Sequence, residues 1–207
     1  MNLLREYIRV LLTEAAKGPS DLPDNVSVVI ADRGFRGIRI FYAVEDSLNP
    51  GEWIKARRND VGISGVVMIS QPLQAYGECG GAWEVMGSEA VQGWGPMLYD
   101  VAMEYATQNG GGLISDRQAV SPSARNVWDY YMSNRGDVTG IQLDDKQNTL
   151  TPEEEDNCMQ SVAMKGVNPK SGGPMNVEWQ DSPLSKRYTK PPTTMNALEA
   201  AGKLVVL

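Results

Sequence analysis

The chain has 207 residues, of which 42% are hydrophobic and 22% charged, which suits one globular domain and excludes wholesale disorder. Its formal net charge of −7 argues against a nucleic-acid-binding protein, because such proteins usually present a basic face. The chain contains no histidine, so Ser-His-Asp and Cys-His nucleophiles are excluded and the commonest zinc ligand is missing. We therefore expect neither a nucleic-acid partner nor a metal site.

The cysteines and the hydropathy pattern bear on the cellular compartment. Cys79 and Cys158 lack the spacing of metal ligands and are too few for a disulfide framework. No stretch approaches the ~20 apolar residues that span a bilayer. No secretory signal is recognisable either. We expect a cytoplasmic protein with no membrane partner.

An amphipathic helix is predicted at the amino terminus. Its apolar positions recur at helical spacing, and they are Leu3, Leu4, Tyr7, Ile8, Leu11 and Leu12. Gly18 and Pro19 end this helix, and a linker rich in proline and aspartate follows. Residues 1–18 are therefore predicted to form a separate module.

Strands dominate the next part of the chain, and helices then alternate with strands. The predicted strands are 26–30, 37–44, 65–69 and 82–86. Apolar residues recur at helical spacing after Pro96 and after Ser121. Short strands are predicted at 113–115 and 138–143. This order indicates an α/β (α+β) protein in which helices flank a central mixed sheet.

The carboxy-terminal segment 146–207 is predicted to extend this core. Residues 151–154, with the sequence Thr-Pro-Glu-Glu, have the pattern of a helix start. Residues 165–192 are rich in Pro, Gly, Ser and Lys, which is typical of a loop. A helix over 195–201 and an edge strand over 204–207 are expected to end the segment.

The turn that follows the fourth strand carries the functional prediction. Gly93 and Gly95 allow the backbone to turn tightly and to approach a ligand closely. The first turn of the next helix has N–H groups without intrahelical acceptors, and it lies at the positive end of the helix dipole. These features together are typical of a phosphate or pyrophosphate site. The alternative is a plain strand-to-helix turn.

This segment resembles the acetyl-coenzyme A loop of the GNAT acyltransferases. The family pattern is an apolar-x-Val strand, then Arg/Gln-x-x-Gly-x-Gly/Ala, then an amphipathic helix. Trp83-Glu84-Val85 stands at the strand motif, and Gly93 and Gly95 stand at the two small positions. The order of elements agrees over roughly residues 65–143, so the resemblance implies a GNAT-like core over residues 19–145.

Three positions depart from the family pattern. Ala90 replaces the Arg/Gln of the loop, and Gln92 comes two residues late. Pro96 has no N–H group to donate to a phosphate. Ser121 stands at the asparagine that begins the family's second helix. These departures bear on cofactor affinity more than on the fold.

The resemblance implies acetyl-coenzyme A as cofactor substrate and an unknown amine as acceptor. The backbone of Val85 and Met86 would pair with the pantetheine arm. The loop residues implied in cofactor binding are Gln92, Gly93, Trp94 and Gly95.

The resemblance also implies a base and an acid. Glu84 is the first candidate for the base that deprotonates the amine, and Glu89 is the second. Trp128 stands where the family commonly has the tyrosine that protonates the leaving thiolate, so Tyr131, one helical turn later, is the candidate acid. The alternatives are that Glu84 faces solvent and that Tyr131 is a core residue.

Three functions are open at this point. The first is an acyl-coenzyme A-dependent N-acyltransferase that transfers an acetyl group to an amine. The second is a non-catalytic phage virion or host-interaction protein that retains a GNAT-like fold, which Ala90 and Pro96 favour. The third, metal-dependent hydrolysis, has little support, because Asp144-Asp145 and residues 153–156 have the composition of solvated acidic segments.

The first fourteen residues also resemble the leaders that direct proteins into the proheads of T-even-type phages. Leu12-Thr13-Glu14 is similar to the Leu/Ile-x-Glu site at which such leaders are removed. A lone helix this short is marginal in water, so its apolar face needs a partner surface. The resemblance implies a phage head or host protein as partner of residues 1–14, and a place in the virion interior as well as the host cytoplasm. A helix docked on its own domain is the alternative.

Overall fold

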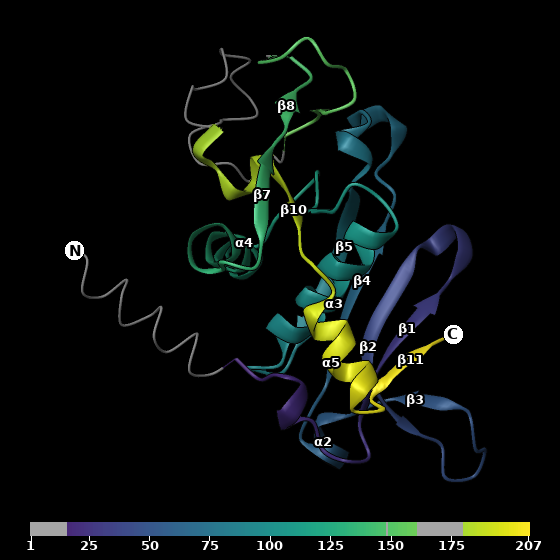
Figure 1. Cartoon of the computed structure of the whole chain (residues 1–207). Helices are drawn as coiled ribbons and strands as arrows, with labels where there is room; N and C mark the ends of the chain where they lie inside the picture. Colours follow the sequence, from purple (N-terminus) through teal and green to yellow (C-terminus); the bar gives the residue numbers. More distant parts are fainter. Residues whose placement is uncertain (1–15, 148, 161–179) are drawn as a thin grey trace. The chain divides into compact units, whose positions relative to one another are not determined.

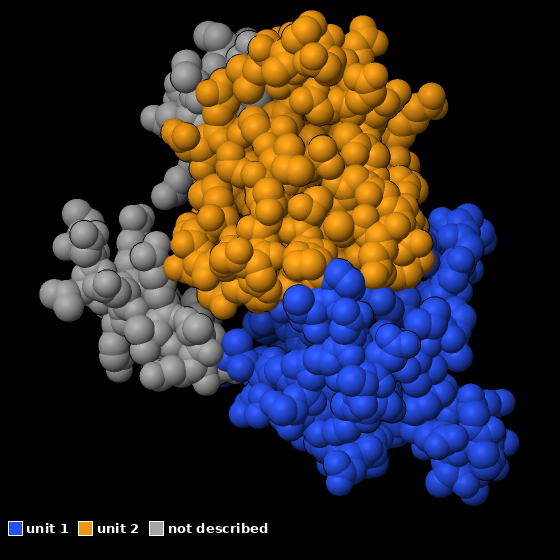
Figure 2. Space-filling view, in the orientation of Figure 1, with its two compact units in different colours: residues 1–69, 87–102, 192–207 blue, residues 70–86, 103–191 orange. Residues whose placement is uncertain are grey.

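A computed structural model describes residues 16–147, 149–160 and 180–207. This part of the chain is a mixed α/β structure, whose helices and strands are drawn in Figure 1. It divides into two compact units, each assembled from segments distant in the sequence (Figure 2). The described residues of unit 1 are 16–69, 87–102 and 192–207, and those of unit 2 are 70–86, 103–147, 149–160 and 180–191.

Unit 1 is built around a mainly antiparallel sheet. Its strands are β1 (Ser27–Asp32), β2 (Ile38–Glu45), β3 (Trp53–Lys55), β4 (Gly65–Ser70) and β11 (Leu204–Val206). β2 pairs antiparallel with β1, β3 and β4, and β11 runs parallel to β1 at the edge. The helical elements of this unit are η1 (Pro19–Asp21), η2 (Gly34–Arg36), α2 (Arg58–Val61) and α5 (Thr193–Ala200).

Branched and aromatic side chains form the strands of unit 1 and fill its core. Val28 lies opposite Tyr42 and Ile40 lies opposite Val67 in the strand register, and all four are buried. Side chains of this kind fit the pleated surface of a half-buried strand. Successive residues point to opposite faces, and a second buried cluster consists of Val29, Ala31, Phe41, Ala43 and Val66. Both faces of this sheet are therefore apolar.

Strand β5 (Trp83–Ala90) and helix α3 (Gly95–Gln108) contribute residues to both units. In β5, Trp83–Met86 belongs to unit 2 and Gly87–Ala90 to unit 1. In unit 1, the predicted apolar stripe of α3 is buried at Leu98, Val101 and Ala102.

Unit 2 contains a mixed sheet, a long helix and a small two-stranded sheet. Its strands besides the first half of β5 are β6 (Leu113–Ile114), β7 (Thr139–Gln142), β8 (Asp144–Asp145), β9 (Asn157–Cys158) and β10 (Lys186–Thr189). β6 runs parallel to β5, while β10 lies antiparallel to both β6 and β7. Its 3₁₀ turns are η3 (Gln74–Tyr76), η4 (Cys79–Gly81) and η6 (Pro183–Ser185).

Helix α4 (Pro122–Asn134) begins as the sequence predicts. The Ser121 hydroxyl accepts the N–H of Ala124 at 3.2 Å, and Pro122 occupies the first helical position. A serine cap satisfies one N–H group of the first turn, and proline lacks an N–H that would have been left unpaired there.

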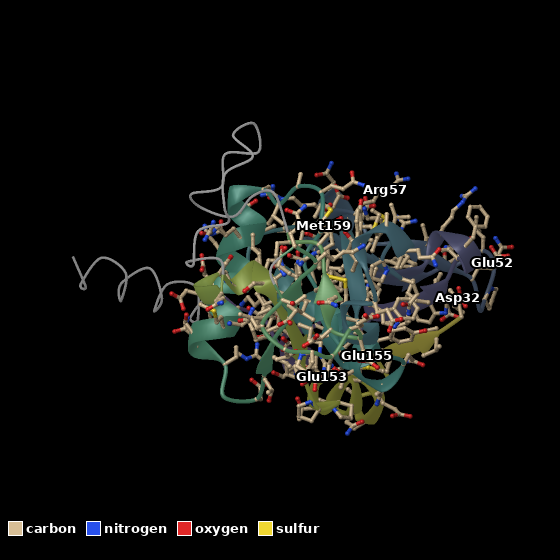
Figure 3. The ribbon with its side chains drawn as sticks, turned by 90° about the horizontal axis from the view of Figure 1, so that it is seen from above. Asp32, Glu52, Arg57, Glu153, Glu155 and Met159 are labelled. Atoms are coloured by element: carbon tan, nitrogen blue, oxygen red, sulfur yellow. A yellow bond between two sulfur atoms is a disulfide. The ribbon has the colours of Figure 1, made fainter. Side chains whose placement is uncertain are left out.

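A disulfide joins Cys79 to Cys158 within unit 2 and links η4 to β9 (Figure 3). The sulfur atoms lie in a buried apolar cluster with Tyr76, Ala82, Ile114 and Leu143. No disulfide framework was expected, and this single bond was not predicted because a separation of 79 positions gives no sign of proximity. Disulfides persist mainly in oxidising compartments, so this bond weighs against the expected cytoplasmic location.

A fully buried ion pair forms a second cross-link in unit 2. The Lys190 ammonium donates to the Glu104 carboxylate, and both side chains have no exposed surface. Asp137 lies 3.5 Å from the same ammonium. The Lys190 amide also donates to Thr107 Oγ1 at 3.1 Å, so the end of β10 is tied to the second half of α3.

Most of the predicted elements are confirmed. The strands expected at 26–30, 37–44, 65–69 and 82–86 correspond to β1, β2, β4 and β5. The helices expected after Pro96 and Ser121 are α3 and α4, and the final helix and edge strand are α5 and β11. Segment 146–207, expected as an extension of the core, supplies β10 to the sheet of unit 2 and β11 to that of unit 1. The predicted helix over residues 1–14 lies outside the described residues.

Three predictions in the last third of the chain are wrong. Residues 151–154 are not helical, because the Asp144 carboxylate accepts the amides of Leu150 and Thr151 and draws this segment into a loop. Asp144 and Asp145 are themselves buried rather than solvated. In the described part of 165–192, a loop was expected where η6 and β10 lie.

Two kinds of feature are absent from the described residues. No helix in this part of the chain is long and apolar enough to cross a membrane. No group of three or more His, Cys, Asp or Glu side chains that could hold a metal ion is found there.

The disulfide is expected to stabilise unit 2 strongly. A cross-link over a loop of this length removes chain entropy from the unfolded state worth about 4.5 kcal/mol, the upper range for native disulfides. The double variant Cys79→Ser/Cys158→Ser should lower the free energy of unfolding by up to that amount, measured by urea denaturation. Equal stabilities of the oxidised wild type and the double variant would contradict this expectation.

The buried ion pair gives a second stability prediction. Replacing Glu104 by Gln leaves the Lys190 charge buried without its main partner, so we expect a loss of roughly 3 kcal/mol. Glu153→Gln makes the same chemical change at an exposed position (Figure 3), so it serves as the matched control and should alter stability by less than about 0.5 kcal/mol. Similar thermal denaturation curves for the two variants would show that the pair adds nothing.

Candidate functional site

The predicted binding loop lies in unit 1, between the second half of β5 and the start of α3. Gly93 has a φ of +86°, a backbone conformation that glycine adopts without strain. The Trp94 amide donates to the Val91 carbonyl at 3.0 Å, which closes a tight turn. The glycine turn expected from the sequence is therefore present.

Neighbouring residues of unit 1 hold this loop in place. The Trp94 ring is buried and meets the Tyr42 ring edge to face, with 5.6 Å between the centroids. The Tyr42 hydroxyl donates to the Trp94 carbonyl at 2.6 Å, and burial raises the pKa of that hydroxyl far above its usual range. The Val91 amide donates to the Ser64 carbonyl at 2.8 Å. The loop is therefore anchored by hydrogen bonds of its backbone and by one buried ring.

The loop amides differ in their hydrogen bonding. Trp94 N–H is engaged in the turn, so it is not one of the anion donors that the resemblance implies. The Gly93 and Gly95 amides have no acceptor among the described residues. Gln92 is exposed, with no described contact of its side chain. Two backbone donors therefore remain at the amino-terminal end of α3, where the helix dipole favours an anion.

A contact between Lys17 and the loop was not predicted from the sequence. The Lys17 amide donates to the Gly93 carbonyl at 2.9 Å, and the Lys17 side chain is exposed. Lys17 lies at the end of the predicted amino-terminal module 1–18, far from the loop in sequence. The contact is made by the Lys17 backbone, and it ties the loop to the segment before η1.

The outer part of β5 in unit 1 carries two further polar pairs. Ser88 and Tyr99 share a hydroxyl–hydroxyl hydrogen bond of 2.9 Å, and burial raises the pKa of Tyr99. Glu89 is exposed and accepts from Lys55 Nζ at 2.6 Å. The hydrogen bond and charge of Lys55 lower the pKa of Glu89, which makes this carboxylate a poorer base than Glu84.

In unit 2, strand β5 extends further along the sheet than its neighbour β6. The two strands pair only at Trp83 with Leu113 and at Glu84 with Ile114, and β6 then ends. Within the described part of unit 2, no strand continues this edge alongside Val85 and Met86. Val85 is buried, whereas Met86 is 49% exposed. A strand edge of this kind can accept an extended ligand through main-chain hydrogen bonds.

Glu84 is buried in unit 2, with 2% of its surface exposed. Its carboxylate accepts the Arg117 amide at 2.6 Å. Burial raises the pKa of Glu84, although the Arg117 amide and the Arg117 charge both act to lower it. The alternative in which Glu84 faces solvent is therefore wrong. A carboxyl group with a raised pKa is suited to proton transfer near neutral pH.

The aromatic residues of α4 pack inside unit 2. Trp128 stacks on Tyr188 with 5.2 Å between ring centroids, and Tyr131 is 1% exposed. The Tyr130 ring and the Arg135 guanidinium both contact the Tyr131 ring. Tyr131 is thus a core residue in this structure, and its role as an acid stays a prediction.

Comparisons with known proteins add no relatives, since no protein-family model, no curated protein and no solved structure matches the chain.

The two loop glycines give a matched pair for mutagenesis. Gly93→Ala places a side chain at a φ of +86°, so it should destabilise the protein by about 1 kcal/mol or more. At Gly95 the φ is not positive and an added Cβ would meet Ala90 at an ordinary 3.6 Å, so Gly95→Ala should be nearly neutral. Urea denaturation of both variants checks this. Equal losses in the free energy of unfolding would show that alanine is not strained at position 93.

Proposed function

We propose that the chain is an acyl-coenzyme A-dependent N-acyltransferase of the GNAT type, which transfers an acetyl group to an amine. The proposal depends most on β5, which runs past the end of β6 and leads into the glycine turn. The order strand, glycine turn, helix, short strand, helix is that of the resemblance described above, and β5, α3, β6 and α4 follow it. A non-catalytic protein would need neither the open edge of β5 nor the loop amides without acceptors.

The loop supplies the features that a pyrophosphate needs. The Gly93 and Gly95 amides have no acceptor among the described residues. Backbone amides at the start of a helix bind phosphate oxygens well. The edge of β5 at Val85 and Met86 would take the extended pantetheine arm, as a strand takes a peptide.

The reaction needs a base for the acceptor and an acid for the leaving group. The amine nitrogen attacks the thioester carbonyl, the carbon–sulfur bond breaks, and the thiolate takes up a proton. Glu84, buried and with a raised pKa, would accept the proton of the ammonium, directly or through water. Tyr131 remains the proposed donor of the proton to the thiolate.

A second candidate is a non-catalytic protein that keeps this fold, such as a packaged phage component or a host-interaction protein. Three observations favour it: Ala90 stands where the family has Arg or Gln, Pro96 has no N–H, and the Trp94 amide is engaged in the turn. Its proposed partner segment, residues 1–14, lies outside the described residues. Mass spectrometry of the protein from virions tests the leader, because an intact Met1 there would exclude removal after Glu14.

Ligand binding separates the two candidates. Acetyl-coenzyme A at about 100 times its Kd should stabilise the protein by about 2.7 kcal/mol, seen as a rise in Tm. Gln92→Glu adds a negative charge to the loop and should weaken this effect, whereas Gln71→Glu makes the same change at another exposed position and should not. An unchanged Tm at millimolar acetyl-coenzyme A would exclude the enzymatic function and leave the binding protein.

A further inference from the structure

Arg117 is a fully buried arginine in the segment that follows β6 in unit 2. Its side chain has no exposed surface. Nε donates to the Ser115 carbonyl at 2.8 Å, and Nη2 donates to the Leu184 carbonyl at 2.8 Å and to the Ser115 hydroxyl. The guanidinium therefore folds back onto its own loop and also reaches the turn η6.

The acceptors of this guanidinium are neutral. Besides the two carbonyls and the hydroxyl, Nη1 faces the Cys158 sulfur at 4.0 Å, and that sulfur belongs to the disulfide. No carboxylate among the described residues forms an ion pair with Arg117. A buried positive charge without a direct counter-ion lowers the stability of the folded protein. Burial accordingly lowers the pKa of Arg117 to about 10, and the nearby charges of Glu84 and Asp116 oppose that change.

The backbone of the same residue holds Glu84. The Arg117 amide donates to Glu84 Oε1 at 2.6 Å, across a separation of 33 positions. Because the guanidinium clamps the loop on Ser115 and Leu184, the direction of this amide is fixed by the arginine side chain. One residue therefore presents both a hydrogen bond and a positive charge to a single buried carboxylate.

We propose that Arg117 is the positioning residue of Glu84: its clamped loop aims the amide at the carboxylate, and its guanidinium charge keeps that carboxylate ionised in a buried site. The role of Glu84 as base rests on the proposed function, but the link between the two residues does not. Without Arg117, burial would raise the pKa of Glu84 further and make its ionised form rarer, and only the ionised form can accept a proton.

The groups around Glu84 act on its pKa in opposite directions. Burial raises the pKa of Glu84, the Arg117 amide and the Arg117 charge lower it, and the Asp116 charge raises it. The Asp116 carboxylate is turned to its own loop, where it accepts the amides of Gln118 and Ala119. Arg117 is therefore the group that offsets the burial of Glu84.

A measurement on the wild-type protein tests the hydrogen bond. An amide that donates to a carboxylate shifts its proton resonance when the carboxylate is protonated. In a pH titration followed by nuclear magnetic resonance, the Arg117 amide proton should move with a midpoint above the ordinary glutamate pKa. The midpoint should vanish in Glu84→Gln. An Arg117 amide that does not titrate, or that titrates equally in Glu84→Gln, would overturn the proposal.

A variant series tests the charge. In Arg117→Met the pKa of Glu84, read from its side-chain carboxyl carbon, should rise by about one unit or more, a tenfold change in its ionised-to-protonated ratio. Arg117→Lys should raise the pKa of Glu84 by less, because lysine keeps the positive charge but lacks the planar guanidinium with its several N–H donors. The control variant Arg57→Met, at an exposed position (Figure 3), should leave the pKa of Glu84 unchanged. An unchanged or lowered pKa in Arg117→Met would contradict the proposal, and if that variant does not fold, the wild-type titration decides.

The two proposals can fail separately. If acetyl-coenzyme A does not bind while the Glu84 pKa still depends on Arg117, only the proposed enzymatic function is rejected. If acetyl transfer is observed, the acid limb of the kcat/KM profile should move to higher pH in Arg117→Lys, with little change in acetyl-coenzyme A binding. A profile that does not move would leave Arg117 with a structural role alone.

Discussion

Two buried charges without direct ion-pair partners set the main constraint on unit 2. Glu84 lies on β5 and Arg117 lies on the segment after β6, and both side chains are buried. Their burial is tolerated because hydrogen bonds converge on both: the Arg117 amide on the carboxylate, and Ser115 and Leu184 on the guanidinium. These bonds tie β5, the end of β6 and η6 together, so the position of each element depends on the others.

This constraint also bears on the edge of β5. Because the chain turns away after Ile114 to form the Arg117 loop, β6 cannot continue alongside Val85 and Met86. The end of β5–β6 pairing before Val85 and a buried carboxylate with a raised pKa are thus consequences of the same local geometry. In unit 1, the glycine turn is fixed from its carbonyl side by Tyr42 and Lys17, which leaves two amides without acceptors among the described residues.

The local features of the fold could be predicted from the sequence, and the long-range ones could not. The turn at Gly93 follows from the conformational freedom of one residue, and α4 follows from the Ser121 cap. β10 was missed because it buries mainly Tyr188 between polar neighbours, which gives almost no alternating pattern. The disulfide was missed because the cysteines are 79 positions apart.

The candidate site shows the same division. The glycine turn could be predicted because glycines before a helix are a local signal, whereas the hydrogen bond of the Trp94 amide to Val91 could not. The burial of Glu84 could not be predicted, since it depends on Arg117, an arginine in a polar stretch with no sign of burial. Lys17 was missed for the same reason, because only the folded chain brings it to Gly93.

In the proposed function, the amides of the glycine turn bind the pyrophosphate of acetyl-coenzyme A. Protein labelled with ¹⁵N-glycine allows these amides to be followed directly during a titration with acetyl-coenzyme A. We predict saturable shifts of the Gly93 and Gly95 resonances, larger than those of glycines distant from the loop in sequence such as Gly34 and Gly136. Resonances of Gly93 and Gly95 that stay fixed while the ligand reaches millimolar concentration would contradict the claim.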